Sequence, residues 1–207
     1  MVLGLKGKLI AFEGIDGSGK SSQTREVAGR LRRMGYNVVE TAEPTDGPIG
    51  KEIRENYLSG KVRIDQMALQ ERFTADRAWH FRQMRPYLEE DKIIITDRFL
   101  HSSVTYGHAS IPKDGAARQI LAMNQECVPM PDLTLIFDLE PELAMERKDQ
   151  RGSNTEIFEK VGIQALVREG YRIYFPPSPT VVWIDASRGK EEVTEAALRT
   201  VLGILRR

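Results

Sequence analysis

The sequence predicts an α/β protein built on a doubly wound, five-stranded parallel sheet with helices on both faces. Three observations indicate this class. Five short apolar runs rich in β-branched residues occur at residues 8–12, 37–41, 92–96, 133–137 and 180–184. The runs lack strict alternation of apolar and polar residues, which is typical of strands buried on both faces. Segments with helical spacing lie between them, and such long crossovers join parallel strands with right-handed connections.

The helices are predicted from apolar stripes and stop signals. Residues 20–34 form the first predicted helix, whose stripe consists of Val27, Leu31 and Met34. Gly35 follows as a C-terminal stop. A later helix begins near Ile64. The last helix carries a stripe formed by Val193, Ala197, Val201 and Leu205.

Length and composition narrow the classes of protein. With 207 residues the chain is long enough for one core, and we expect a single domain over residues 1–207. Its 30 basic and 30 acidic residues cancel, so nothing indicates a surface for nucleic acid or anionic membrane. Cys127 is the only cysteine, which excludes an internal disulfide and fits a reducing compartment. Because no membrane-length apolar stretch or signal peptide is recognisable, we expect a cytoplasmic protein.

The first apolar run leads directly into a glycine-rich segment. It reads Gly14-Ile15-Asp16-Gly17-Ser18-Gly19-Lys20-Ser21-Ser22, which matches the phosphate-binding pattern G-x-x-x-x-G-K-[ST]. Glycines let backbone N–H groups approach an anion, and the following helix start favours negative charge. Lys20 adds a full charge for the β- and γ-phosphates, and the Ser21 hydroxyl can ligate Mg²⁺. A glycine-rich turn that only caps a helix is the alternative. The strand before and the amphipathic helix after it favour a P-loop NTPase fold that binds ATP here.

Polar residues also follow the second and third runs, where ligands of such sheets bind. Glu43-Pro44-Thr45 follows the second run, and Asp97-Arg98 ends the third. A carboxylate at Asp97 is where a P-loop enzyme holds its metal or a metal-bound water. Arg98 has five donors in a plane, which suits bidentate phosphate capture. A salt bridge that closes the strand end is the alternative.

Phe73 and Arg77 lie four positions apart on the helix that begins near Ile64, and therefore share one face. An aromatic ring beside a guanidinium forms a platform for a planar heterocycle, because the ring stacks and the arginine donates to a carbonyl oxygen. The alternative is a core phenylalanine with a snorkelling arginine. Arg54 lies on the preceding helix, and taken alone it is explained as a solvated surface charge.

Residues 147–157 form a polar, basic segment between two helical patterns. Such a segment can close as a lid over phosphates and supply an arginine to the transition state. A solvated loop is the alternative. The lid is favoured because phosphoryl transfer to anything other than water requires closure.

Taken in order and spacing, these motifs resemble the thymidylate kinase family. The segments that carry the resemblance are Phe12-Glu13-Gly14-Ile15-Asp16-Gly17-Ser18-Gly19-Lys20, Glu43-Pro44-Thr45, Phe73-Thr74-Ala75-Asp76-Arg77, Asp97-Arg98-Phe99 and Pro131-Asp132-Leu133. The resemblance runs from about Lys8 to Ser187. The phosphate loop alone would not single out this family, whereas the ordered set does.

The resemblance implies transfer of the ATP γ-phosphoryl group to dTMP, giving dTDP and ADP with Mg²⁺. It implies that Lys20 holds the transferring phosphate and that Ser21 and Asp97 serve the metal. The loop with Ser187 and Arg188 is similar to the one that holds adenine through backbone groups. A two-fold homodimer is also implied.

For the acceptor, the resemblance implies that Asp16 binds the 3′-hydroxyl and that Arg54 and Arg98 clamp the phosphate. Phe73 would stack on thymine while Arg77 donates to its exocyclic oxygen. The residues implied to shape the site, face the base or crowd out a ribose 2′-hydroxyl are Glu43, Pro44, Ser102, Ser103 and Tyr106.

Members of the family carry an additional arginine either in the phosphate loop or in the lid. Here Gly17 and Ser18 occupy the loop, so we expect the lid to supply it, with Arg151 as first choice and Arg147 as second. Gly107 and His108 follow Tyr106 where a glutamine is frequent in the family, which leaves strictness toward thymine open. We therefore expect a preference for dTMP with measurable activity on dUMP.

Two other functions compete with this interpretation. Another small-molecule P-loop kinase would keep Lys20 and Asp97 but would not need the Phe73 and Arg77 pair. A nucleotide-dependent switch such as a GTPase would need an Asn-Lys-x-Asp motif for guanine, and the sequence has none. A catalytically dead homologue is disfavoured by the intact Lys20, Asp97 and Arg98.

Overall fold

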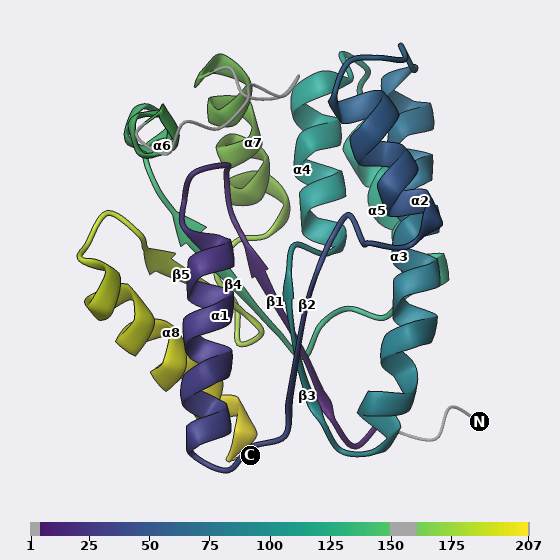
Figure 1. Ribbon diagram of the computed structural model, residues 1–207. Coiled ribbons are helices and arrows are strands. Elements are labelled where there is room, and N and C mark those ends of the chain that lie inside the picture. The colour runs from purple at the N-terminus through teal and green to yellow at the C-terminus, as the bar shows by residue number, and fades with distance from the viewer. Residues whose placement is uncertain (1–4, 150–160, 207) are drawn as a thin grey trace.

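The sheet has the predicted class and strand number. The computed structural model describes residues 5–149 and 161–206, and within them five parallel strands form one sheet in the order β2-β3-β1-β4-β5 (Figure 1). The strands are β1 (Lys8–Glu13), β2 (Val38–Ala42), β3 (Ile93–Asp97), β4 (Leu133–Asp138) and β5 (Val181–Asp185). Each begins within one residue of the apolar run that predicts it, so the α/β prediction is confirmed.

The central strand β1 brings the predicted site together. It pairs with β3 on one side, from Lys8 opposite Ile93 to Phe12 opposite Asp97, and with β4 on the other. Ile10 and Phe12 are fully buried, as a strand covered on both faces requires. Because β1 and β3 end at the same edge, the phosphate loop and Asp97 become neighbours.

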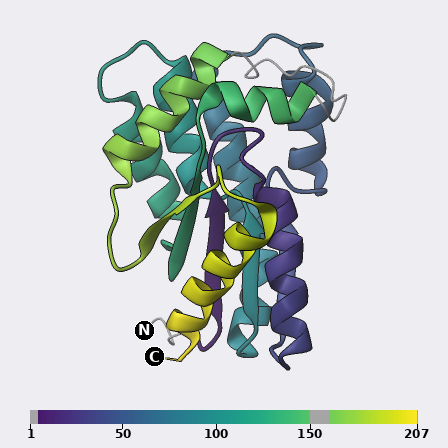
Figure 2. The same ribbon diagram turned by 90° about the vertical axis from the view of Figure 1, so that its left-hand side faces the viewer.

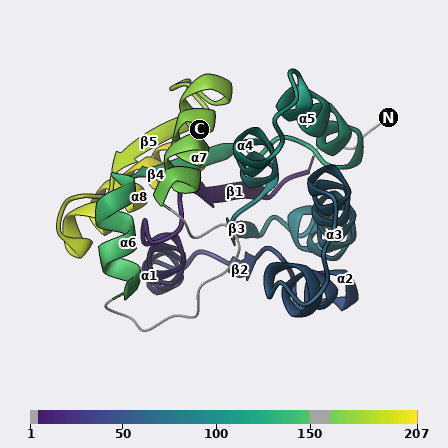
Figure 3. The same cartoon turned by 90° about the horizontal axis from the view of Figure 1, so that it is seen from above.

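Helices cover both faces of the sheet. Their bounds are α1 (Lys20–Arg33), α2 (Pro48–Glu52), the π-helix η1 (Ile53–Leu58), α3 (Gln66–Glu89), α4 (Leu100–Ser110), α5 (Ala116–Cys127), α6 (Pro141–Asp149), α7 (Val161–Tyr174) and α8 (Lys190–Leu205). The helices α1 and α8 pack together on one face (Figure 2). On the other face α4 packs against α7 and α5 (Figure 3). Every helix in the described residues is too short or too polar to cross a lipid bilayer.

Local signals explain where the helices begin and end. The Asp65 carboxylate accepts from the backbone N–H of Met67 at 2.9 Å and caps α3, which begins two residues after Ile64. Gly35, with φ of 92°, ends the first helix. Met34 lies at the C-cap of that helix and is 52% exposed, so the buried stripe ends at Leu31.

Candidate active site

The glycine-rich loop between β1 and α1 is tightly packed. Gly14 and Gly17 have φ values of 140° and 85°, which side-chain-bearing residues rarely adopt. A Cβ at Gly17 would lie 2.2 Å from the carbonyl oxygen of Ala144 on α6, and one at Gly14 would lie 2.6 Å from that of Phe137. The glycines therefore let β4 and α6 touch the loop, which leaves its backbone in the form expected of an anion cradle.

Lys20 is buried at the end of this loop. Its Nζ donates to the carbonyl oxygen of Ile15 at 2.7 Å, and the residue is only 5% exposed. Burial and the nearby charge of Arg98 lower the pKa of Lys20 to about 8, although the Asp16, Asp97 and Glu13 carboxylates oppose the shift. Two cations held this close in a dry site are stabilised by an anionic ligand such as a polyphosphate.

Ser21 and Asp97 bring two hard oxygen donors together at the carboxyl edge of the sheet. The Ser21 hydroxyl donates to Asp97 Oδ2, and Asp97 Oδ1 is buried with no hydrogen-bond partner in residues 5–149 and 161–206. The same ranges hold no group of three or more acidic, histidine or cysteine side chains able to bind a metal. Mg²⁺ fits this donor set, because it is usually held by one or two protein oxygens with phosphates and water completing the octahedron.

Arg98 joins the phosphate loop to α4. Its guanidinium pairs with Asp16 in the loop and donates to Ser102 Oγ at 2.9 Å and to the Tyr106 hydroxyl at 3.3 Å. The residue has φ of 71°, and its backbone N–H is held by the carbonyl oxygen of Phe12 at 2.9 Å. A left-handed conformation costs a non-glycine residue free energy, and such strain clusters at functional sites.

Sequence reasoning missed the buried polar cluster behind Arg98. The Glu13 carboxylate accepts from the backbone N–H of Phe99 at 2.7 Å, from Ser102 Oγ at 2.6 Å and from the Tyr171 hydroxyl at 2.8 Å. Burial opposes its ionisation, but His101, Ser102 and the charge of Arg98 together lower the pKa of Glu13 to about 2. A charged Glu13 therefore fixes the end of β1 to α4 and α7. Its place directly before the glycine-rich motif was the one available signal.

Gln164 on α7 was also missed. Its Oε1 accepts from the backbone N–H of Asp16 at 2.9 Å, and its Nε2 donates to Asp16 Oδ2 at 3.2 Å. Helix α7 thus orients Asp16 at the mouth of the site. No local sequence pattern links residues this far apart in the chain.

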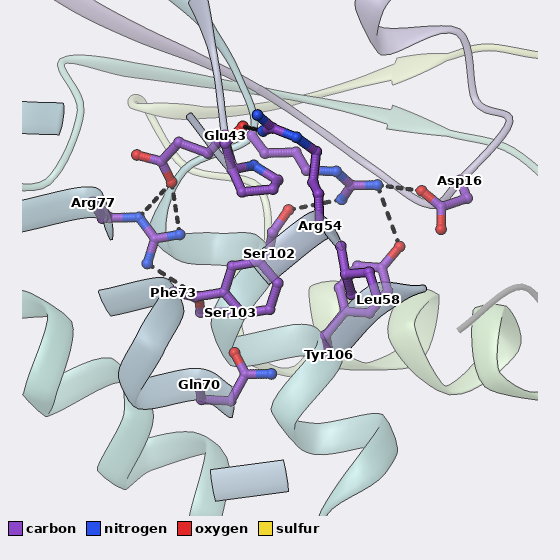
Figure 4. Close-up of a pocket in the computed structure, with 12 residues that line it drawn as sticks. Asp16, Glu43, Arg54, Leu58, Gln70, Phe73, Arg77, Ser102, Ser103 and Tyr106 are labelled. Atoms are coloured by element: carbon purple, nitrogen blue, oxygen red, sulfur yellow. Dashed lines mark hydrogen bonds and ion pairs between the residues drawn. The ribbon is translucent and has the colours of Figure 1, made fainter. Parts of the chain in front are cut away.

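A cavity of about 230 Å³ opens beside Arg98, between the phosphate loop, η1, α3 and α4 (Figure 4). This volume is below the roughly 300–1,000 Å³ of most ligand pockets, and suits one small planar group. All ten residues predicted for the acceptor site line it, together with Leu58 and Gln70: Asp16, Glu43, Pro44, Arg54, Phe73, Arg77, Arg98, Ser102, Ser103 and Tyr106. The structure therefore gathers residues from positions 16 to 106 around one space. Their binding roles stay predictions.

Arg77 is the most firmly held of these side chains. Its Nε donates to Glu43 at 2.8 Å and Nη2 lies 2.7 Å from the same carboxylate. Its Nη1 donates to Ser103 Oγ at 3.0 Å and to Asn124. Among contacts of the described residues, this leaves one of its five N–H groups, on Nη2. The side chain is buried, so it does not snorkel to solvent, whereas Phe73 is only partly buried and borders the cavity.

Arg54 lies at the rim of the cavity, on the π-helical stretch that the sequence did not predict. Its Nη1 donates to the carbonyl oxygen of Pro44 at 2.6 Å and its Nη2 to Asp46 at 2.8 Å. The side chain is 34% exposed and can reach a ligand at the cavity entrance. The π-turn at Ile53–Leu58 brings both Arg54 and Leu58 to the cavity lining.

The remaining predicted residues lie near the end of β5. Asp185 accepts from the backbone N–H of Ser187 at 3.0 Å and from Arg188 Nε at 3.1 Å, which folds this loop into a turn. Arg147 donates to the carbonyl oxygens of Ala186 at 2.9 Å and Ser187 at 3.4 Å. Arg151 and most of the predicted lid, residues 147–157, fall outside the described residues.

A P-loop beside an open cavity lined with arginine and aromatic side chains is typical of kinases of the P-loop nucleotide-binding class. A sequence profile of the thymidylate kinase family matches residues 12–197. The chain therefore belongs to the thymidylate kinase family, and the resemblance seen in the sequence is confirmed.

Individual relatives agree with this assignment. A probable thymidylate kinase of Methanosarcina mazei is 35% identical over 207 residues, with 98% of this chain and 99% of the relative covered. One of Pyrobaculum aerophilum is 36% identical, with 95% and 97% covered. One of Archaeoglobus fulgidus is 35% identical, with 95% and 96% covered. The similarity thus extends over nearly the full length of each chain.

Proposed function

We propose that this protein transfers the γ-phosphoryl group of ATP to dTMP, producing dTDP and ADP. The observation that carries the proposal is the meeting of two sites at Arg98. On one side lies the phosphate loop with buried Lys20, and on the other the cavity that contains Phe73 and Arg77. Membership of the thymidylate kinase family supports the same reaction.

On the donor side, the loop from Gly14 to Ser22 binds the polyphosphate through backbone N–H groups. Lys20 places its charge on the transferring phosphate. Ser21 and Asp97 hold Mg²⁺, which when bound offsets negative charge on the phosphates. The turn with Ser187 and Arg188 receives the adenine. Arg151, and next Arg147, are our candidates for the lid arginine.

On the acceptor side, the cavity holds the thymine ring against Phe73. Arg77 donates its remaining N–H to the exocyclic oxygen, because Glu43, Ser103 and Asn124 fix its orientation. Arg54 and Arg98 clamp the phosphate at the entrance.

The deoxyribose would lie at the mouth of the cavity. Asp16 binds its 3′-hydroxyl, and Tyr106 crowds the position of a 2′-hydroxyl. Glu43, Pro44, Ser102 and Ser103 complete the walls. Two polyanions can then meet in line, because the arginines and Lys20 cancel their repulsion. A homodimer in the cytoplasm remains part of the proposal from family resemblance.

A panel of acceptors tests this function. With ATP and Mg²⁺, we expect ADP release to require an acceptor and to be fastest with dTMP. Activity on dUMP should be roughly 10- to 200-fold lower in kcat/KM, the range that one methyl group in an apolar pocket supplies. Activity on dCMP should be lower still, because the Arg77 donor would meet an amino group. Slow ADP release that dTMP does not change would instead indicate a nucleotide switch.

The pH dependence of ATP use tests the environment of Lys20. Burial and Arg98 lower the pKa of the Lys20 ammonium to about 8 in the free protein. Because only the charged form attracts phosphate, kcat/KM for ATP should be level below about pH 8 and fall about tenfold per pH unit above it. Initial rates at limiting ATP from pH 6.5 to 9.5 measure this. A profile that stays level to pH 9.5 would contradict the assigned environment.

A further inference from the structure

We propose that the side-chain amide of Gln70 reads the imide edge of the pyrimidine base and is a specificity-determining group of this site. This inference rests on the proposed function and deepens it. Gln70 lies on α3, one turn before Phe73, and lines the same cavity (Figure 4). The residue is 0% exposed, and neither its Oε1 nor its Nε2 has a hydrogen-bond partner in the described part of the chain.

An amide buried in this way is unusual on physical grounds. A carboxamide offers two donors and two acceptor positions, and leaving all of them unpaired away from water is unfavourable. The same helix satisfies a neighbouring polar side chain, since Thr74 Oγ1 donates to the backbone carbonyl of Gln70 at 2.9 Å. The unpaired amide of Gln70 borders the cavity, so a ligand in that cavity can complete its hydrogen bonds.

Helix α4 packs beside this side chain at Gly107. Gly107 faces Gln70, and a Cβ at position 107 would lie 3.8 Å from Gln70 Cγ and 2.2 Å from Ile120 Cδ1. A Cβ at position 107 would therefore be in ordinary contact with Gln70 and would require the terminal methyl group of Ile120 to move. Gly107 thus packs beside the aliphatic part of Gln70, whose amide lies at the cavity wall.

The amide supplies what Arg77 lacks. The imide edge of thymine or uracil presents an N3–H donor between two carbonyl acceptors. Arg77 has only donors, so it can pair with a carbonyl but cannot accept from N3–H. The Glu43 carboxylate, which also lines the cavity, is engaged by Arg77 and by His80 Nδ1 at 3.0 Å. Gln70 Oε1 is a neutral acceptor suited to N3–H, and its Nε2 can donate to the adjacent carbonyl.

The two side chains together distinguish imide bases from cytosine. A carboxamide alone could rotate by about 180° to exchange its oxygen and nitrogen, and so pair with either kind of base. Arg77 cannot turn, because Glu43, Ser103 and Asn124 hold its guanidinium. With the donor of Arg77 fixed on an exocyclic oxygen, the Gln70 amide adopts the orientation that accepts from N3–H.

The test replaces Gln70 by methionine, which has similar length but no hydrogen-bonding groups. We expect kcat/KM for dTMP to fall on the order of 10- to 100-fold, because the N3–H would be buried without a partner. The KM for ATP should not change. The melting temperature should not fall, since the substitution removes an unpaired buried amide. Gln119→Met, on an exposed position of α5, is the matched control and should behave like the parent.

An acceptor with a blocked imide separates recognition from a structural role. In the parent, kcat/KM should be higher for dTMP than for N3-methyl-dTMP. Gln70→Met should reduce the ratio of these two kcat/KM values at least tenfold. A ratio that does not change in Gln70→Met overturns the proposal, as does a lowered melting temperature with parental kcat/KM for dTMP. Gln70→Leu serves if the methionine variant does not fold. If the parent does not phosphorylate dTMP, the proposed function fails. The role of Gln70 is then decided by calorimetry, which gives the dissociation constants of dTMP and N3-methyl-dTMP for the parent and for Gln70→Met, and the same change in their ratio is expected.

Discussion

Replacing Lys20 by methionine is expected to lower kcat about 10³-fold with only a small change in the KM for dTMP. Its Nζ is the one ammonium group buried in the phosphate loop. In a site without water, such a group strongly stabilises the negative charge of the transition state. Single-turnover measurements at saturating ATP and dTMP would show the loss directly. The control is Lys113→Met, which removes an exposed lysine and should leave the rate as in the parent.

The same substitution should raise stability at neutral pH. Folding lowers the pKa of Lys20 from its ordinary value of 10.5 to about 8. At pH 7 this difference corresponds to roughly 3 kcal/mol of unfavourable free energy in the folded protein. Between pH 8 and 10.5 the unfolded chain holds a proton that the folded chain has released, so the parent gains stability as the pH rises through this interval. Lys20→Met should therefore melt above the parent at pH 7, and the difference should shrink toward pH 10.5. A variant that melts below the parent at pH 7 would contradict this.

Removing the guanidinium of Arg98 should have an effect of similar size. Arg98 contacts both the phosphate loop and α4, so its charge lies where donor and acceptor phosphates would meet. We expect Arg98→Ala to lower kcat/KM for dTMP about 10³- to 10⁵-fold, the range for an arginine that stabilises a phosphoryl transition state. Arg98→Lys should recover only a small part, because an ammonium group cannot pair with two oxygens in the same plane.

Initial rates with both nucleotides varied would check this prediction for Arg98. Arg118→Ala, which removes an exposed arginine on α5, is the matched control. If Arg98→Ala loses less than tenfold in kcat/KM for dTMP, the meeting of the two sites at this residue is not what drives catalysis.

Most of the fold could be predicted because its signals are local. The five β-branched runs coincide with the five strands, since strands buried on both faces of a parallel sheet need continuous apolar sequence. The phosphate loop could also be predicted, because its glycines form a recognisable local pattern. The structure requires these glycines, since a side chain at Gly17 would overlap Ala144. The other site residues were predicted in two ways. Some follow the ends of strands, where ligands of parallel sheets bind, and the rest were implied by the family resemblance.

The parts that could not be predicted depend on contacts between distant segments. Glu13 pairs with Tyr171, and Asp16 with Gln164, across about 150 positions of the chain. The π-helical turn that carries Arg54 has no propensity signal of its own. Gln70 had a usable signal, since it lies at helical spacing from Phe73 and Arg77. Its importance became visible only once its unpaired amide was seen beside the cavity.

The short helix α6 touches both places where the donor nucleotide would be held. Ala144 packs on Gly17 of the phosphate loop. One turn further along, Arg147 donates hydrogen bonds to two carbonyl oxygens of the turn after β5. Because one continuous helix makes both contacts, it fixes the distance between the phosphate loop and the turn after β5.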